Sequence, residues 1–207
     1  MADSIWPTIH AERKALADDL AGLSPEQWRT QSLCSEWDVH QVLAHQLAAA
    51  KMTPPKFLVK FAASGFKFDK FAAKEVAAES AGGPEATLAA FRAAIPRQTA
   101  PPGPKDTWLG EAFVHGEDIR RPLGIKRTYP AGQVARTIAF YAKSNAIIGG
   151  RERIAGLTLQ ATDTDFSVGS GPLVTGPAIS LLLVAAGRMS ALADLSGPGV
   201  ETLRGRA

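Results

Sequence analysis

Hydrophobic residues in the first part of the chain recur every three or four positions, which is the spacing of an amphipathic α-helix. In residues 8–23, for example, Ile9, Leu16 and Leu20 fall on one stripe, while the charged residues lie largely elsewhere. The same period returns in later segments, and breaks rich in glycine and proline separate them. We therefore predict helices over residues 8–23, 35–51, 84–95, 108–123 and 130–148.

Two short segments have the form of a helix N-terminus. Ser24-Pro-Glu-Gln27 reads as a capping box with proline at the first helical position, and it opens a short turn that carries Trp28. Ser35-Glu-Trp-Asp38 reads as a second capping box. This pattern predicts that the helix ending near Lys51 begins at Ser35.

After residue 150 the pattern changes from helical periodicity to short alternating runs bounded by glycine. Alternation of apolar and polar residues is typical of half-buried strands. We predict strands over 157–162, 166–168, 172–175 and 200–203, and a helix over 176–194. The chain is thus predicted to be α+β, with a helical domain over residues 1–150 and a small α/β module over residues 151–207.

Composition indicates an ordinary globular protein. Of 207 residues, 45% are hydrophobic and 21% are charged, and the net charge is +3. This charge density is far below that of a dedicated nucleic-acid binder, so we expect no nucleic-acid partner. The longest apolar stretch, 178–186, is too short to span a bilayer, so we expect no stable membrane insertion.

The chain has one cysteine, Cys34, which excludes an intramolecular disulfide and fits a reducing compartment. The first seven residues lack the basic and apolar regions of a signal peptide, so we expect a cytoplasmic protein. Cys34 precedes a predicted helix N-terminus, where a nucleophilic role is one hypothesis. We favour a small packed residue, because no histidine lies beside Cys34 in the sequence.

Three side chains are candidates for a metal site. Glu111 and His115 are four residues apart in a predicted helix, so both lie on one face, one turn apart. His45 lies in a separate helix, at a position where a core residue is expected. Two histidines and one glutamate form a three-ligand set that leaves one coordination position open, as in catalytic zinc sites. The alternatives are a surface ion pair for the helix pair and a buried, satisfied histidine for His45.

Phenylalanine and lysine alternate in residues 56–74, after the interruption at Pro54-Pro55. A basic amphipathic stretch of this kind can lie on a membrane surface. We favour a bundle helix or a lid with its lysines in solvent. A third interpretation is that the phenylalanines line the mouth of the site and the lysines attract an anionic substrate.

Three motifs in order resemble the mycothiol-dependent maleylpyruvate isomerase family of actinobacterial proteins, a branch of the DinB-like metal-dependent helical bundles. The first is the block from Glu12-Arg13 through Leu33-Cys-Ser-Glu-Trp to Ala44-His45. The second is Glu111-Ala-Phe-Val-His-Gly-Glu-Asp118. The third combines Phe166–Pro177 with Ala186-Gly-Arg188 and Leu195-Ser-Gly197. The resemblance runs over most of residues 8–205 and is weakest across residues 50–105.

This resemblance implies a fold, a metal centre and a cofactor. It implies a DinB-like four-helix bundle followed by a small α/β module similar to a shortened sterol-carrier fold. It implies that His45, Glu111 and His115 hold a divalent metal, usually zinc. Asp118 would orient a ligand or a substrate group, and Arg188 would hold an anionic substrate or the thiol cofactor, mycothiol. A plain helix-end cation is the alternative for Arg188.

The function expected from the resemblance is a metal-dependent enzyme that activates a low-molecular-weight thiol, mycothiol. It would act on a small electrophile, either as an S-transferase or as a cis–trans isomerase of the maleylpyruvate isomerase type. Its partners would be that thiol and a small electrophilic substrate, with an anionic substrate as one option. The protein would be a monomer or a homodimer. The alternative is a non-catalytic protein that binds a small molecule or lipid and keeps only a vestigial metal site.

Overall fold

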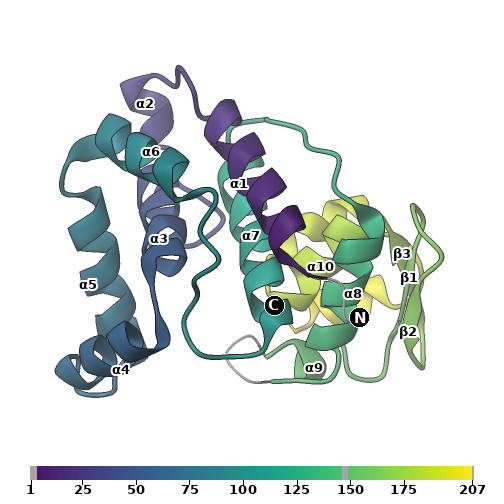
Figure 1. The fold of residues 1–207 in the computed structure, drawn as a ribbon. Helices are drawn as coiled ribbons and strands as arrows, with labels where there is room; N and C mark the ends of the chain where they lie inside the picture. Colours follow the sequence, from purple (N-terminus) through teal and green to yellow (C-terminus); the bar gives the residue numbers. More distant parts are fainter. Residues whose placement is uncertain (1–3, 146–148, 207) are drawn as a thin grey trace. The chain divides into compact units, whose positions relative to one another are not determined.

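The computed structural model describes residues 4–145 and 149–206 and is helix-rich, with one small sheet, as an α+β fold requires (Figure 1). It divides into two compact units, residues 1–127 and residues 128–207. The sequence placed a boundary at residue 150. The units divide earlier because the helix that follows Pro130 packs against a helix near the C-terminus.

The first unit is helical throughout its described elements. Helix α3 packs against α5, α6 and α7, and α1 packs against α6 and α7. Apolar side chains from α1, α3 and α6, including Leu16, Leu43 and Phe91, form its core, with Trp28 and Ile119. The helices are α1 (Trp6–Asp19), α2 (Pro25–Trp28), α3 (Val39–Lys51), α4 (Pro54–Ala63), α5 (Phe68–Ser80), α6 (Gly83–Ala94) and α7 (Lys105–Arg120).

The two predicted capping boxes have different outcomes. The box at Ser24 is present, since its hydroxyl accepts from the Gln27 amide and the Gln27 side chain accepts from the Ser24 amide. The box predicted at Ser35 is wrong. Helix α3 begins three residues later, where the Asp38 carboxylate accepts from the Gln41 amide at 2.8 Å and Gln41 reciprocates. Residues 35 and 36 form a turn before the helix, and Asp38 is extended and pairs with Gln31.

The second unit contains a three-stranded sheet, with α10 packed against β1, β3 and α8. The strand order is β2-β1-β3, with β1 antiparallel to β2 and parallel to β3. Leu159 in the central strand pairs with Val168 and Val174. The elements are α8 (Ala131–Tyr141), α9 (Gly150–Arg153), β1 (Thr158–Ala161), β2 (Ser167–Gly169), β3 (Leu173–Gly176), α10 (Ala178–Ala185), a 3-10 helix (Met189–Asp194) and α11 (Val200–Arg204).

Three predictions in this unit need correction. The predicted strand over 200–203 is the helix α11, because Ser196 already pairs with β3 and the chain turns at Gly197, whose φ is +105°. The predicted helix over 176–194 breaks at Gly187, whose φ is +89°. The predicted helix over 130–148 is shorter, since α8 ends at Tyr141, and residues 146–148 lie outside the described residues. Among the described helices, none has both the length and the apolar character needed to cross a membrane.

Candidate metal centre

Three side chains from two helices meet within the first unit. Glu111 and His115 come from α7, and His45 comes from α3, which packs against it. The Glu111 Oε2 atom lies 3.1 Å from His45 Nε2 and 3.3 Å from His115 Nε2. One ligand atom from each residue lies within 4.8 Å of the other two. The three candidate ligands are therefore close enough for one ion to contact all of them.

Local structure accounts for the direction of each ligand. The turn-to-turn spacing of α7 stacks Glu111 over His115, as the sequence predicted. The ring of His45 stacks against Trp37, with centroids 4.8 Å apart and planes tilted by 32°. The His45 and His115 rings meet edge to face at 4.8 Å. The aromatic contact on His45 limits its rotation, so the imidazole is held toward α7.

Asp118 completes the cluster on the other side of His115. Its carboxylate accepts a hydrogen bond from His115 Nδ1 at 2.8 Å, and its side chain has no exposed surface. That bond fixes the proton on Nδ1 and leaves Nε2, which faces Glu111, as the free donor atom for a metal. A carboxylate behind a histidine in this way is the usual support for a metal-ligating imidazole.

Cys34 lies next to this support, which sequence reasoning did not anticipate. Its Sγ donates to Asp118 Oδ2 at 3.1 Å and lies 3.9 Å from His115 Nδ1. The loop is fixed by a bond from the Leu33 amide to the Asp118 carbonyl, 3.1 Å long. Cys34 is also partly buried against the core, as a packed residue would be. No histidine neighbours it in sequence, so only tertiary structure could reveal the contact.

The charges of the cluster reinforce one another. Burial disfavours the charged forms of both Glu111 and His115. For Glu111, the positive charge of His115 and the hydrogen bonds from the His115 and His45 imidazoles outweigh burial and hold its pKa well below the usual range. For His115, burial is outweighed by the Glu111 charge and by bonds with Asp118 and Cys34, which raise its pKa well above the ordinary value. Without a metal, the centre is therefore a buried ion pair.

This ion pair predicts how stability of the metal-free protein depends on pH. The raised pKa of His115 stabilises the fold fully below about pH 6.5, and this stability is lost as pH rises through the raised value. The lowered pKa of Glu111 adds stability above about pH 4.3. This stability is lost as the pH falls through the lowered pKa of Glu111. We expect the unfolding free energy to fall above pH 6.5, by up to about 1.4 kcal/mol per pH unit.

The measurement is urea unfolding of chelator-treated protein across this range. In the matched control, His115→Gln, the decline above pH 6.5 should disappear. An unchanged decline in that variant would contradict the assignment to His115.

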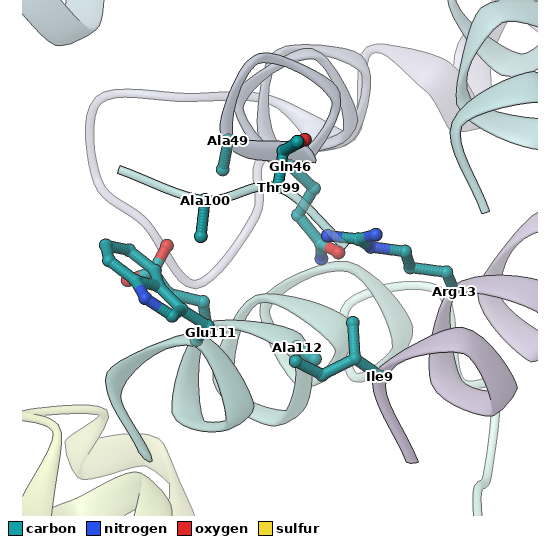
Figure 2. Close-up of a pocket in the computed structure, with 9 residues that line it drawn as sticks. Ile9, Arg13, Gln46, Ala49, Thr99, Ala100, Glu111 and Ala112 are labelled. Atoms are coloured by element: carbon teal, nitrogen blue, oxygen red, sulfur yellow. The ribbon is translucent and has the colours of Figure 1, made fainter. Parts of the chain in front are cut away.

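A small cavity is lined in part by Glu111. Its volume, about 20 Å³, is enough for roughly one water molecule. Figure 2 shows Arg13 from α1 and Gln46 from α3 reaching into the same space, with Glu111 and Ala112 on α7. Gln46 Nε2 is buried and has no hydrogen-bond partner among the described residues, and burial lowers the pKa of Arg13 to about 10. The cavity is therefore a polar extension of the candidate centre.

Arg188, the remaining predicted site residue, belongs to the second unit. It is half-buried just before the 3-10 helix, and its guanidinium donates to the Ala186 carbonyl at 2.9 Å. In the same unit, burial and, to a smaller extent, the charge of Arg188 lower the pKa of Arg153. The role of Arg188 toward an anionic substrate or a thiol stays a prediction.

Comparison with known proteins finds a family match over the first part of the chain, which includes His45 but ends before Glu111 and His115. Residues 9–108 match the family described as the mycothiol maleylpyruvate isomerase N-terminal domain. No curated protein matches the chain significantly. Two solved structures, the mycothiol-dependent maleylpyruvate isomerase and a histidine-to-alanine mutant of it, align with TM-scores of 0.57 and 0.58. Both are 15% identical, and each alignment covers 93% of this chain and 91% of that chain, so they share its fold. Residues 9–108 are therefore similar to a mycothiol maleylpyruvate isomerase N-terminal domain, in agreement with the family resemblance that the motifs indicate.

Proposed function

We propose that this protein is a metal-dependent enzyme that activates mycothiol for S-transfer to, or cis–trans isomerisation of, a small electrophile. The observation that carries the proposal is the convergence of His45, Glu111 and His115 within 4.8 Å. The family match and the shared fold with a mycothiol-dependent maleylpyruvate isomerase support the choice of thiol.

The residues present fit a divalent metal. Two imidazole nitrogens and one carboxylate oxygen are a ligand set of catalytic zinc, which leaves a fourth position for a small molecule. The side chains of His45, Glu111 and His115 are 17%, 27% and 10% exposed, so the set is sheltered but can be reached. Asp118 holds the His115 tautomer that such a site needs.

The chemistry follows from the ionisation of a thiol. A free thiol has a pKa of about 8.5 and is mostly protonated at neutral pH. A bound zinc ion would supply the missing activation, because coordination deprotonates a thiol. His45, Glu111 and His115 would hold the ion, and Asp118 would keep His115 oriented. Arg188 would neutralise an anionic group on the thiol or the substrate.

The same activated thiol supports both reaction types. In a transferase, it adds to the electrophile or displaces a leaving group, and the conjugate is released. In an isomerase, it adds to a cis double bond, rotation occurs about the resulting single bond, and elimination returns the thiol with the trans product. Which outcome occurs depends on the substrate that the pocket admits.

The test compares zinc-loaded wild type with His45→Ala in the presence of mycothiol. Maleylpyruvate and a series of activated alkenes serve as electrophiles, and chromatography separates conjugates from isomers. Removing a residue that only supports a metal ligand lowers metal affinity or activity about 10–100-fold. Removing a ligand itself should therefore lower turnover at least about 100-fold. His45→Ala should also lose mycothiol binding in calorimetry.

Cys34→Ala is the matched control. Cys34 faces the Nδ1 side of His115, opposite the Nε2 atom that faces Glu111, so its removal should leave turnover within a few-fold. Abolished turnover in Cys34→Ala would assign the nucleophile to this chain rather than to an external thiol. If His45→Ala kept its ligand, the non-catalytic carrier would be favoured instead.

A further inference from the structure

The large hydrophobic side chains that the described structure exposes lie together in one short segment. Leu58, Val59, Phe66 and Phe68 are 63%, 71%, 71% and 46% exposed. All four fall within the hairpin formed by α4, the turn after it and the start of α5, and α4 has no buried residue. Figure 1 shows α4 lying across the ends of α3 and α5. Such a concentration marks an interaction surface rather than scattered exposure.

Other phenylalanines hold this hairpin in shape. Phe57 and Phe61 stack along α4 at 5.2 Å, and both meet Phe71 of α5 edge to face, at 5.2 and 6.1 Å. Phe71 itself is buried. The inner face of α4 is therefore already occupied by aromatic contacts. Leu58 and Val59 stay exposed on a helix whose other face contacts α5 through these rings.

The backbone at the tip of the hairpin is strained. The turn ends α4 through bonds from the Gly65 amide to the Ala62 carbonyl and from the Phe66 amide to the Phe61 carbonyl. Gly65 adopts a left-handed φ of +66°, and Phe66 follows with a φ of +57°. This conformation is unfavourable for a bulky residue, and here it leaves the Phe66 ring largely exposed, with one edge-to-face contact to Phe61.

The same segment is strongly basic. Residues 56–74 contain one acidic residue, Asp69, and five lysines, all of which are exposed. Lys60 pairs with Glu75 at 2.6 Å, and Lys74 donates to the Ala63 carbonyl. The remaining three, Lys56, Lys67 and Lys70, have no ion pair among the described residues. Exposed apolar side chains are thus surrounded by cations.

We propose that this α4–α5 surface docks reversibly on an anionic lipid bilayer. The apolar side chains would enter the boundary between headgroups and acyl chains, and the lysines would contact anionic headgroups. Charge complementarity favours this occupant over a second copy of the chain, which would bring like charges together. The proposal is independent of the metal centre and of the reaction.

The test measures binding to vesicles of phosphatidylcholine alone and of phosphatidylcholine with phosphatidylglycerol, by flotation at low and high salt. We expect binding to the anionic vesicles only, and weaker binding at high salt. Each lysine near an anionic surface raises the affinity for the membrane about fivefold. The double substitution Lys67→Gln/Lys70→Gln should therefore weaken binding about 25-fold. Leu58→Ser/Val59→Ser should weaken it by about tenfold or more.

The matched control is Lys105→Gln/Lys126→Gln, which removes two exposed lysines outside this surface and should bind nearly as wild type does. All the substituted side chains are exposed, so circular dichroism melts should coincide. Absence of binding to anionic vesicles at low salt would overturn the proposal. So would equal weakening by the control pair. A wild-type dimer that Leu58→Ser/Val59→Ser converts to monomer would assign the surface to a second copy instead.

Discussion

Wild-type protein should purify with near-stoichiometric zinc, and Glu111→Ala purified beside it should lose that metal. Glu111 is the residue shared by both short contacts, at 3.1 Å from His45 and 3.3 Å from His115. Without its carboxylate, two neutral imidazoles remain, and a site of two ligands binds zinc far more weakly than one of three. We expect affinity to fall by more than the roughly 10–100-fold that loss of a supporting residue costs.

Elemental analysis of tag-free protein, before and after reconstitution, measures this. Glu85→Ala removes an exposed carboxylate from α6 and serves as the control, which should keep the metal. Should both wild type and control lack zinc or any other divalent ion after reconstitution, the metal-enzyme proposal fails. The carrier alternative would then remain.

Asp118→Asn should weaken zinc binding about 10–100-fold while leaving the three ligands in place. The carboxylate has no exposed surface and accepts from both His115 Nδ1 and Cys34 Sγ. Asparagine has nearly the same shape but no charge, and its amide can present a donor to His115. It therefore no longer enforces the tautomer whose Nε2 is free.

Competition with a chromophoric chelator gives the affinity, and a thermal melt of the metal-free protein separates this effect from misfolding. Asp69→Asn makes the same chemical change at an exposed position and should alter neither quantity. An Asp118→Asn protein that melts as wild type does and binds zinc equally well would show that Asp118 does not tune the metal.

The parts of the centre that local geometry determines could be predicted from sequence. The spacing of Glu111 and His115 fixes their contact once α7 is a helix. The contact of His45 with that pair depends on which helices pack together, and hydrophobic periodicity does not specify that packing. The grouping of His45 with Glu111 and His115 came from the family resemblance. The contact of Cys34 depends on a loop that one backbone hydrogen bond, from Leu33 to Asp118, ties to α7, and such a bond leaves no trace in sequence.

Errors in the fold prediction came from competing local signals. Ser35 and Asp38 are both good N-caps, and Asp38 forms the helix start with Gln41 as its reciprocal partner. Val200–Leu203 has strand-like composition, but the preceding turn at Gly197 directs it into a helix. Alternating residues after 150 were correctly predicted as strands, because burial on one face of a sheet imposes that pattern directly.

Burial of α7 has a kinetic consequence for the metal. Every residue from Ala112 to Arg120 on this helix is buried, and Glu111 lies immediately before them. Amide protons in such a helix exchange only in rare openings, so an ion bound there would not be released by fraying of α7. His45 comes from α3 rather than from this buried helix, so it would be the ligand that moves first, by turning away from the His115 ring. Rotation of the His45 side chain on α3 would then set the residence time of the ion. Glu111 and His115 would keep their positions while His45 is turned away.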